Sequence, residues 1–104
     1  MTERHKPHTL TPEEMHRISV FNRHRFDTKT RARDYTKDDI IQATLEARRN
    51  VHDTEIVHHA KMHDMNINED ERQQAEMDYL LAQMTLAEYE KSIAKRGISV
   101  PEEK

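Results

Sequence analysis

The segment from residue 75 to residue 94 carries apolar residues at helical spacing on two opposite faces, and this feature most constrains the fold. At about 100° per residue, one stripe lies nearly opposite the other. A helix that is apolar on two faces needs two partners. One is expected to be a neighbouring helix of the same chain, and the other the N-terminal part, a second copy or a different macromolecule. The first stripe comprises Ala75, Tyr79, Ala82, Leu86, Tyr89 and Ile93, and the second Met77, Leu80, Met84, Ala87 and Ala94.

Large aliphatic residues are scarce elsewhere in the chain. Leu, Ile, Val and Phe together number 18 of 104 residues, below the roughly 20% under which a highly charged chain is read as disordered. The net charge is only −3, so we expect partial order. A chain of this length is one domain at most and buries a small core. We therefore expect its stability to depend on association.

Several functional classes are disfavoured by composition. No apolar run approaches the roughly 18 residues of a membrane span, and no secretory signal precedes the first helix, so a cytoplasmic location is expected. The chain has no cysteine, three serines and one glycine. Disulfides, thiolate metal sites and phosphate-cradling glycine loops are therefore excluded, and nothing supports nucleophilic catalysis. The sequence favours a non-catalytic protein.

The first helix start is marked by Thr11, which suits an N-cap, and by Glu14, which completes a capping box. Leu10 and Met15 are spaced as a hydrophobic staple across this start. The apolar pattern fades after about three turns and predicts a short helix over 12–24. Isolated helices of this length are unstable in water, so its apolar side must dock on something.

The basic stretch from Arg23 to Tyr35 is predicted to be an extended arm. Asp27, Thr28 and Thr30 disfavour helix because their side chains compete for backbone hydrogen bonds or restrict rotamers.

Two further helices are predicted to form a hairpin. Thr36 caps a helix over 37–65, a range without glycine or proline, and Asn68 caps a second over 69–96. Gly97 then supplies a left-handed C-cap. Because the connection is about three residues long, the two helices must lie antiparallel.

The expected fold is all-α: a long antiparallel helical hairpin preceded by a short N-terminal helix and a basic extended arm. We divide the chain into an N-terminal part over 1–36 and a hairpin with a short tail over 37–104. Residues 1–36 carry a net charge of +3 and residues 66–104 carry −4. The N-terminal part is therefore basic and the last helix with its tail acidic.

A metal site is one candidate for chemistry. Histidines and a glutamate on the first hairpin helix recur three or four residues apart, which places imidazole and carboxylate groups along one face. Such a face can hold zinc, and a Glu-x-x-His pair supplies ligands in di-iron bundles. The simpler interpretation is a solvent-facing, histidine-rich helix. The candidate ligands are His52, Glu55, His58, His59 and His63.

The basic arm over 17–35 is a second candidate, because arginines neutralise phosphates and aromatic rings stack on bases. Against a nucleic-acid contact stands the pI of about 6.2, far below the value above about 9 of dedicated nucleic-acid-binding domains. An arginine arm on an acidic protein surface explains the same residues.

The function favoured by the sequence is a small helical accessory or regulatory protein that binds a larger partner, most readily a protein complex. An apolar helix face and the basic arm would form the contact. Self-association into a dimer or four-helix bundle is the alternative use of that face. The predicted partner-binding residues are Tyr79, Leu86, Tyr89, Ile93, Arg23, Arg25, Arg31 and Arg33.

Overall fold

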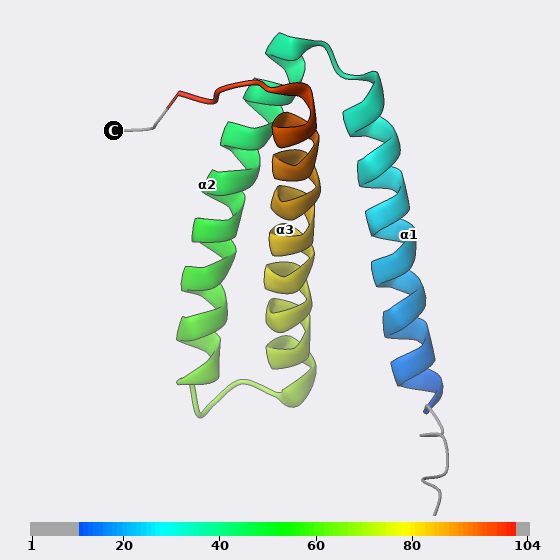
Figure 1. Cartoon of the computed structure of the whole chain (residues 1–104). Helices are drawn as coiled ribbons and strands as arrows, with labels where there is room; N and C mark the ends of the chain where they lie inside the picture. The colour runs from blue at the N-terminus through cyan, green and yellow to red at the C-terminus, as the bar shows by residue number, and fades with distance from the viewer. Residues whose placement is uncertain (1–10, 102–104) are drawn as a thin grey trace, which may run out of the picture.

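The computed structural model describes residues 11–101, which form three helices. They are α1 (Pro12–Asp34), α2 (Lys37–Met62) and α3 (Glu69–Arg96), and no strand occurs among these residues. The all-α class and the antiparallel hairpin of α2 and α3 are thereby confirmed (Figure 1). None of the three helices is both long and apolar enough to cross a membrane.

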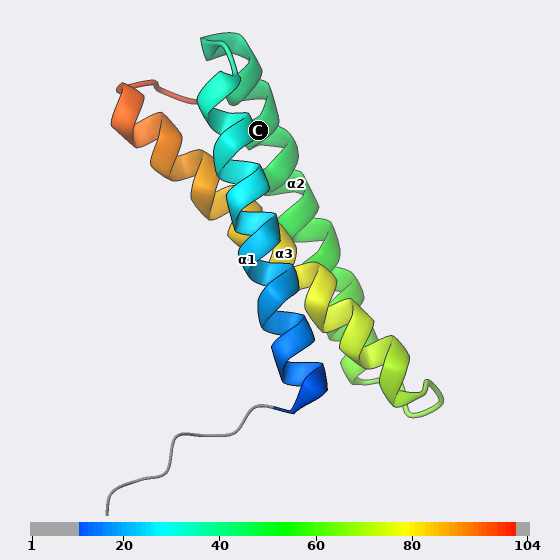
Figure 2. The same cartoon turned by 90° about the vertical axis from the view of Figure 1, so that its right-hand side faces the viewer.

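Helix α3 is the central element of the fold. It packs against α2 on one side and α1 on the other, whereas α1 and α2 make few contacts with each other. Seen from the side, α1 crosses α3 obliquely (Figure 2). Helix α3 therefore has two partners within one chain, as expected. Helix α1, however, covers the face that carries Leu81, Thr85 and Glu88. It leaves most of the predicted second stripe uncovered, and Leu80 of that stripe is 38% exposed.

Because α2 reverses the chain direction, α1 and α3 run the same way. Their C-terminal ends lie at the same end of the molecule (Figure 1).

The helix starts are set by side-chain caps. Thr11 accepts a hydrogen bond from the backbone N–H of Glu14 at 3.1 Å, and Glu14 accepts one from the backbone N–H of Thr11 at 2.9 Å, a complete capping box. Thr36 and Asn68 accept from the N–H groups three residues on, at 3.1 and 2.8 Å. All three predicted caps form. The staple predicted for Leu10 lies outside the described residues.

Helix α3 ends in a Schellman motif. Gly97 has φ +69°, the left-handed region that favours glycine. The N–H of Gly97 donates to the carbonyl of Ala94 at 3.2 Å, and that of Ile98 to the carbonyl of Ile93 at 3.0 Å. The predicted C-cap is confirmed.

The predicted extended arm is wrong, because α1 continues unbroken to Asp34. Thr28 and Ala32 are buried, so the second half of α1 gains packing that its composition does not reveal. The hydroxyl of Thr30 donates to the carbonyl of Phe26 at 2.9 Å, which satisfies it inside the helix. Tertiary burial thus outweighs the weak helix propensity of this stretch.

Helix α2 is also shorter than predicted. It ends at Met62 with His63 as C-cap, and the predicted end at residue 65 is wrong. The backbone N–H of Asp64 bonds to the carbonyl of Lys61 at 3.3 Å in a final tight turn.

The core lies where the C-terminal ends of α1 and α3 meet the start of α2. Its buried members are Ala32, Ile40, Ala47, Tyr89 and Ile93. Elsewhere the hairpin is closed by Ala75 and Ala82, small residues that are buried on α3. The core is small and placed at one end, as expected for a chain poor in large aliphatic residues.

Candidate functional site

The apolar face predicted to bind a partner lies inside the folded chain. Tyr89 is 6% exposed and Ile93 9% exposed, both as members of the core. Leu86 is half-buried and packs against the same cluster. These three side chains are therefore not displayed as a free surface.

Tyr89 also contacts Tyr35, the first residue after α1. The two rings lie 6.1 Å apart between centroids, tilted by 49°. A hydrogen bond to Tyr89, together with burial, raises the pKa of Tyr35. This tyrosine pair joins the end of α1 to α3.

Tyr79 is engaged with the histidine-bearing helix α2. Its ring stacks on His58 with centroids 5.3 Å apart and planes 20° apart, and its hydroxyl donates to Glu55 Oε2 at 3.2 Å. Partial desolvation and the bond to Glu55 raise the pKa of Tyr79. Tyr79, His58 and Glu55 thus form a contact between α2 and α3.

The five predicted metal ligands are not brought together. His59 and His63 form an edge-to-face ring pair with centroids 4.6 Å apart, and His52 is exposed. His58 lies about 100° around the helix from His59 and is stacked against α3. Between residues 11 and 101, no three His, Asp or Glu side chains are placed to hold a metal ion.

The four predicted arginines are all exposed on α1. They do not share one face. Arg31 lies about 160° around the helix from Arg33, and its guanidinium donates to the hydroxyl of Thr28 at 3.4 Å. Arg25 and Arg33 lie within about 80° of each other, and Arg23 lies about 80° beyond Arg33.

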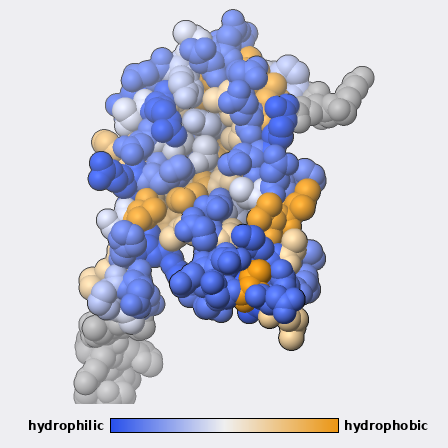
Figure 3. All heavy atoms as spheres, turned by 180° about the vertical axis from the view of Figure 1, so that it is seen from behind, coloured by the Kyte–Doolittle hydropathy of each residue, from blue (hydrophilic) through white to orange (hydrophobic). Residues whose placement is uncertain are grey.

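One stripe of α1 consists of exposed side chains, and we call it the outward face of α1. Two of its members, Lys29 and Arg33, also border α3. It spans an arc of about 100° around the helix and contains only exposed residues and no acidic one. Phe26 is 68% exposed, Met15 51% and Ile18 44%. From behind, apolar side chains of the molecule form patches separated by hydrophilic ones (Figure 3). The outward face of α1 comprises Met15, Ile18, Asn22, Arg25, Phe26, Lys29 and Arg33.

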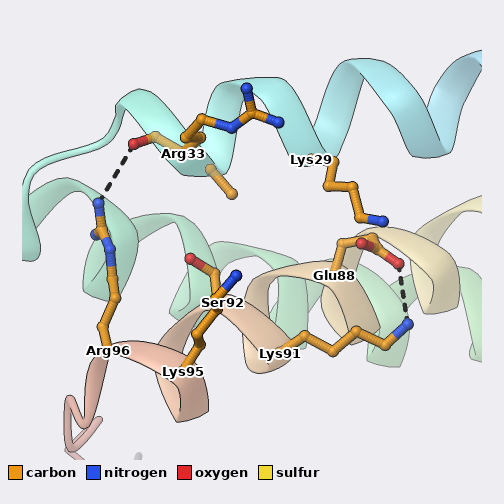
Figure 4. A pocket seen from close by; sticks show the side chains of 8 residues that line it. Lys29, Arg33, Glu88, Lys91, Ser92, Lys95 and Arg96 are labelled. Carbon is orange, nitrogen blue, oxygen red and sulfur yellow. Dashed lines mark hydrogen bonds and ion pairs between the residues drawn. The ribbon is translucent and has the colours of Figure 1, made fainter.

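A second feature is a hollow between the C-terminal halves of α1 and α3, which we call the cationic groove (Figure 4). Its volume is about 630 Å³. Five of its side chains are cationic and one is acidic. The groove is lined by Lys29, Ala32, Arg33, Glu88, Lys91, Ser92, Lys95 and Arg96.

The helix ends explain part of this gathering of cations. Both α1 and α3 end here, and each C-terminus presents carbonyl groups with a partial negative charge. Arg96 donates from Nη2 to the carbonyl oxygens of Tyr35 at 2.6 Å and of Arg33 at 3.5 Å. Arg96 therefore caps α1 from the neighbouring helix.

Glu88 is the only carboxylate of the groove. Its side chain is 4% exposed and accepts from Lys91 Nζ at 3.3 Å. Lys29, Arg33 and Lys95 form no side-chain ion pair within the described part of the chain. The groove therefore holds more positive charge than its own residues balance.

The α1–α3 contact also contains a half-buried histidine, His24, whose Nε2 lies 2.5 Å from the hydroxyl oxygen of Thr85. That hydroxyl donates its proton to the carbonyl of Leu81 at 2.9 Å, so His24 must donate from Nε2. Burial, followed by the nearby Arg31, lowers the pKa of His24, while Asp27 opposes the shift. The arrangement suits a neutral imidazole.

Sequence reasoning missed the α3 side of the cationic groove. Because α3 runs in the same direction as α1, the last turns of the two helices lie side by side. Only this arrangement brings Lys91, Lys95 and Arg96 next to the cations of α1. The sequence did carry one signal for the groove, because both helices have a basic last turn. These residues are Arg31 and Arg33 on α1 and Lys95 and Arg96 on α3.

Comparisons with protein-family models, with curated proteins and with solved structures find no match for this chain.

Proposed function

We propose that this protein is a non-catalytic helical accessory module that binds a larger protein through the outward face of α1. The observation that carries the proposal is the composition of that face, which combines exposed apolar anchors with cations and has no acidic residue. The partner would offer an apolar groove bordered by carboxylates.

The apolar part of the contact is supplied by Met15, Ile18 and Phe26. They recur at helical spacing on one face of α1. Each remains exposed to solvent instead of packing against α3. Phe, Met and Arg are enriched at protein interfaces relative to the rest of protein surfaces. Side chains spaced in this way are the usual anchors of a helix that binds in a groove.

The basic part defines the chemistry of the partner. Arg25, Lys29 and Arg33 share the outward face, whereas the whole chain has a net charge of −3. Positive charge is thus concentrated on this exposed stripe of α1. Complementary charges speed encounter and fix orientation more than they add affinity, so an acidic rim on the partner is expected.

The test is affinity purification with paired variants. Phe26→Ser combined with Arg25→Glu should abolish recovery of the partner while far-ultraviolet circular dichroism stays unchanged, because both residues are exposed. Ile56→Ser with Lys61→Glu, a matched pair on α2, should leave recovery intact. Equal recovery with both variants would contradict the proposal, as would a wild-type protein that retains no specific partner.

A second candidate function is binding of single-stranded nucleic acid, favoured by the position of Phe26 between Arg25 and Lys29 on one face. Exposed aromatic rings stack on bases, and neighbouring cations neutralise phosphates. Fluorescence anisotropy with labelled single-stranded oligonucleotides checks it. Binding that weakens with Phe26→Ser and with added salt would support this candidate, and no saturable binding would remove it.

A further inference from the structure

We propose that the cationic groove binds a small ligand that carries two or more phosphate groups. This inference goes beyond the docking of a protein on α1, because the groove lies in the contact between α1 and α3. Three of its five cations come from α3, and it shares only Lys29 and Arg33 with the outward face of α1.

The charge balance of the groove is the first argument. Five cations face one carboxylate, Glu88, which is occupied by Lys91 at 3.3 Å. The two helix C-termini add roughly one negative charge between them, so the groove remains strongly positive. The like charges that line the groove repel one another, and a multiply charged anion would relieve that repulsion.

The shape of the groove is the second argument. Ala32 and Ser92 are small and leave a hollow of about 630 Å³, which lies within the range of roughly 300–1,000 Å³ for small-ligand sites. Arg96 reaches across to α1 at one end, and Lys29 lies above Glu88 at the other (Figure 4). Such a bounded hollow fits a short, highly charged ligand better than a long polymer.

The available donors are the third argument. Lys29, Arg33 and Lys95 have no side-chain ion pair within residues 11–101. A guanidinium binds phosphate oxygens in bidentate fashion, and an ammonium group offers three donors to a phosphate chain. They come from both walls of the groove, so a ligand with several phosphate groups can contact α1 and α3 together.

The experiment is isothermal titration calorimetry of the full chain with tripolyphosphate and with ATP. Lys95→Gln is the informative variant, because Lys95 lines the groove but lies outside the outward face of α1. Affinity should fall about tenfold, which corresponds to about 1.4 kcal/mol, because the variant loses one charged donor to the phosphate groups. Lys61→Gln, which removes an equal charge from α2, should leave affinity unchanged.

A variant with the opposite expected sign strengthens the test. Glu88→Gln removes the only negative charge of the groove while keeping an oxygen to accept from Lys91, so phosphate binding should tighten. Thermal melts of Lys95→Gln and Glu88→Gln show whether each variant remains folded. A folded Glu88→Gln protein with weaker binding would overturn the proposal.

The two probes distinguish the source of the phosphate groups. Tighter binding of ATP assigns the groove to a nucleotide, and equal binding assigns it to a bare phosphate chain. Both results support the proposal. Absence of saturable binding, or binding that Lys95→Gln leaves unchanged, overturns it. Because Phe26→Ser lies outside the groove and should bind tripolyphosphate normally, failure of this proposal is separable from failure of protein docking.

Discussion

Arg96 Nη2 lies 2.6 Å from the carbonyl oxygen of Tyr35, so the last residue of α3 caps the end of α1. This contact joins elements that are far apart in sequence and parallel in space. At this end of the cationic groove, Arg96 also donates to the carbonyl oxygen of Arg33 (Figure 4).

Removal of this guanidinium should loosen the end of α1. Arg96→Ala is expected to lower the free energy of unfolding by about 1 kcal/mol, below the full value of a charged hydrogen bond because Arg96 is exposed. Urea denaturation measures the change. Arg48→Ala, which breaks only a 4.0 Å surface ion pair with Glu90, is the control with a smaller expected loss. An equal loss in both variants would argue against the capping role.

Ile40 should be the most costly aliphatic truncation on α2. Its side chain is fully buried in the core, so Ile40→Ala is expected to cost about 2–5 kcal/mol through lost burial and a residual cavity. Ile56→Ala, at a 55% exposed position of the same helix, should change stability by less than about 0.5 kcal/mol. Chemical denaturation of both variants compares them directly, and similar losses would contradict the described core.

Gly97 is required for its backbone conformation. A Cβ at Gly97 would meet no atom within 4 Å, so any cost of Gly97→Ala comes from the positive φ alone. That cost should be about 1–2 kcal/mol. Gly97→Asn should cost less, because asparagine tolerates the left-handed region. Thermal unfolding separates the two, and an alanine variant as stable as wild type would contradict the Schellman motif.

His24 should make the packing of α1 sensitive to pH. Its pKa is lowered from the ordinary value of 6.5, first by burial and then by Arg31. The unfolded chain therefore binds the proton more readily, and the contribution of neutral His24 is full above about pH 6.5 and is lost as pH falls through the folded-state pKa.

The measurement is the free energy of unfolding against pH for wild type and for His24→Gln, which keeps a side-chain N–H donor for Thr85. The difference between the two curves should change below about pH 6.5. Parallel curves across that range would contradict the assignment. Histidine NMR titration supplies the folded-state pKa of His24 independently.

The hairpin was predictable because its signals are local. Thr36, Asn68 and Gly97 each act within a few residues, and each cap forms. A second partner of α3 was also predicted, but α1 covers the face with Thr85 and Glu88 and leaves Leu80 of the second apolar stripe 38% exposed. The second half of α1 could not be predicted to be helical from local signals. Its stability depends on burying Thr28 and Ala32 against a helix more than fifty residues away in sequence.

The candidate sites were less predictable for the same reason. The sequence predicted Arg25 and Arg33 as contact residues, but their continuity with Phe26 requires that residues 23–34 be helical. Lys95 faces Arg33 only because α1 and α3 are parallel. Tyr89 and Ile93 belong to the core, whereas the sequence predicts them to bind a partner, because the sequence does not show which apolar stripe meets a helix of the same chain.

The most direct test of the docking proposal is site-specific photo-crosslinking in cells. A photoreactive amino acid replaces Phe26 on the outward face of α1, or Ile56 on α2 as the matched exposed control. The proposal predicts that position 26 crosslinks to one defined protein and that position 56 does not. Crosslinking of the same protein with equal yield from both positions, or no protein crosslinked at position 26, would contradict it.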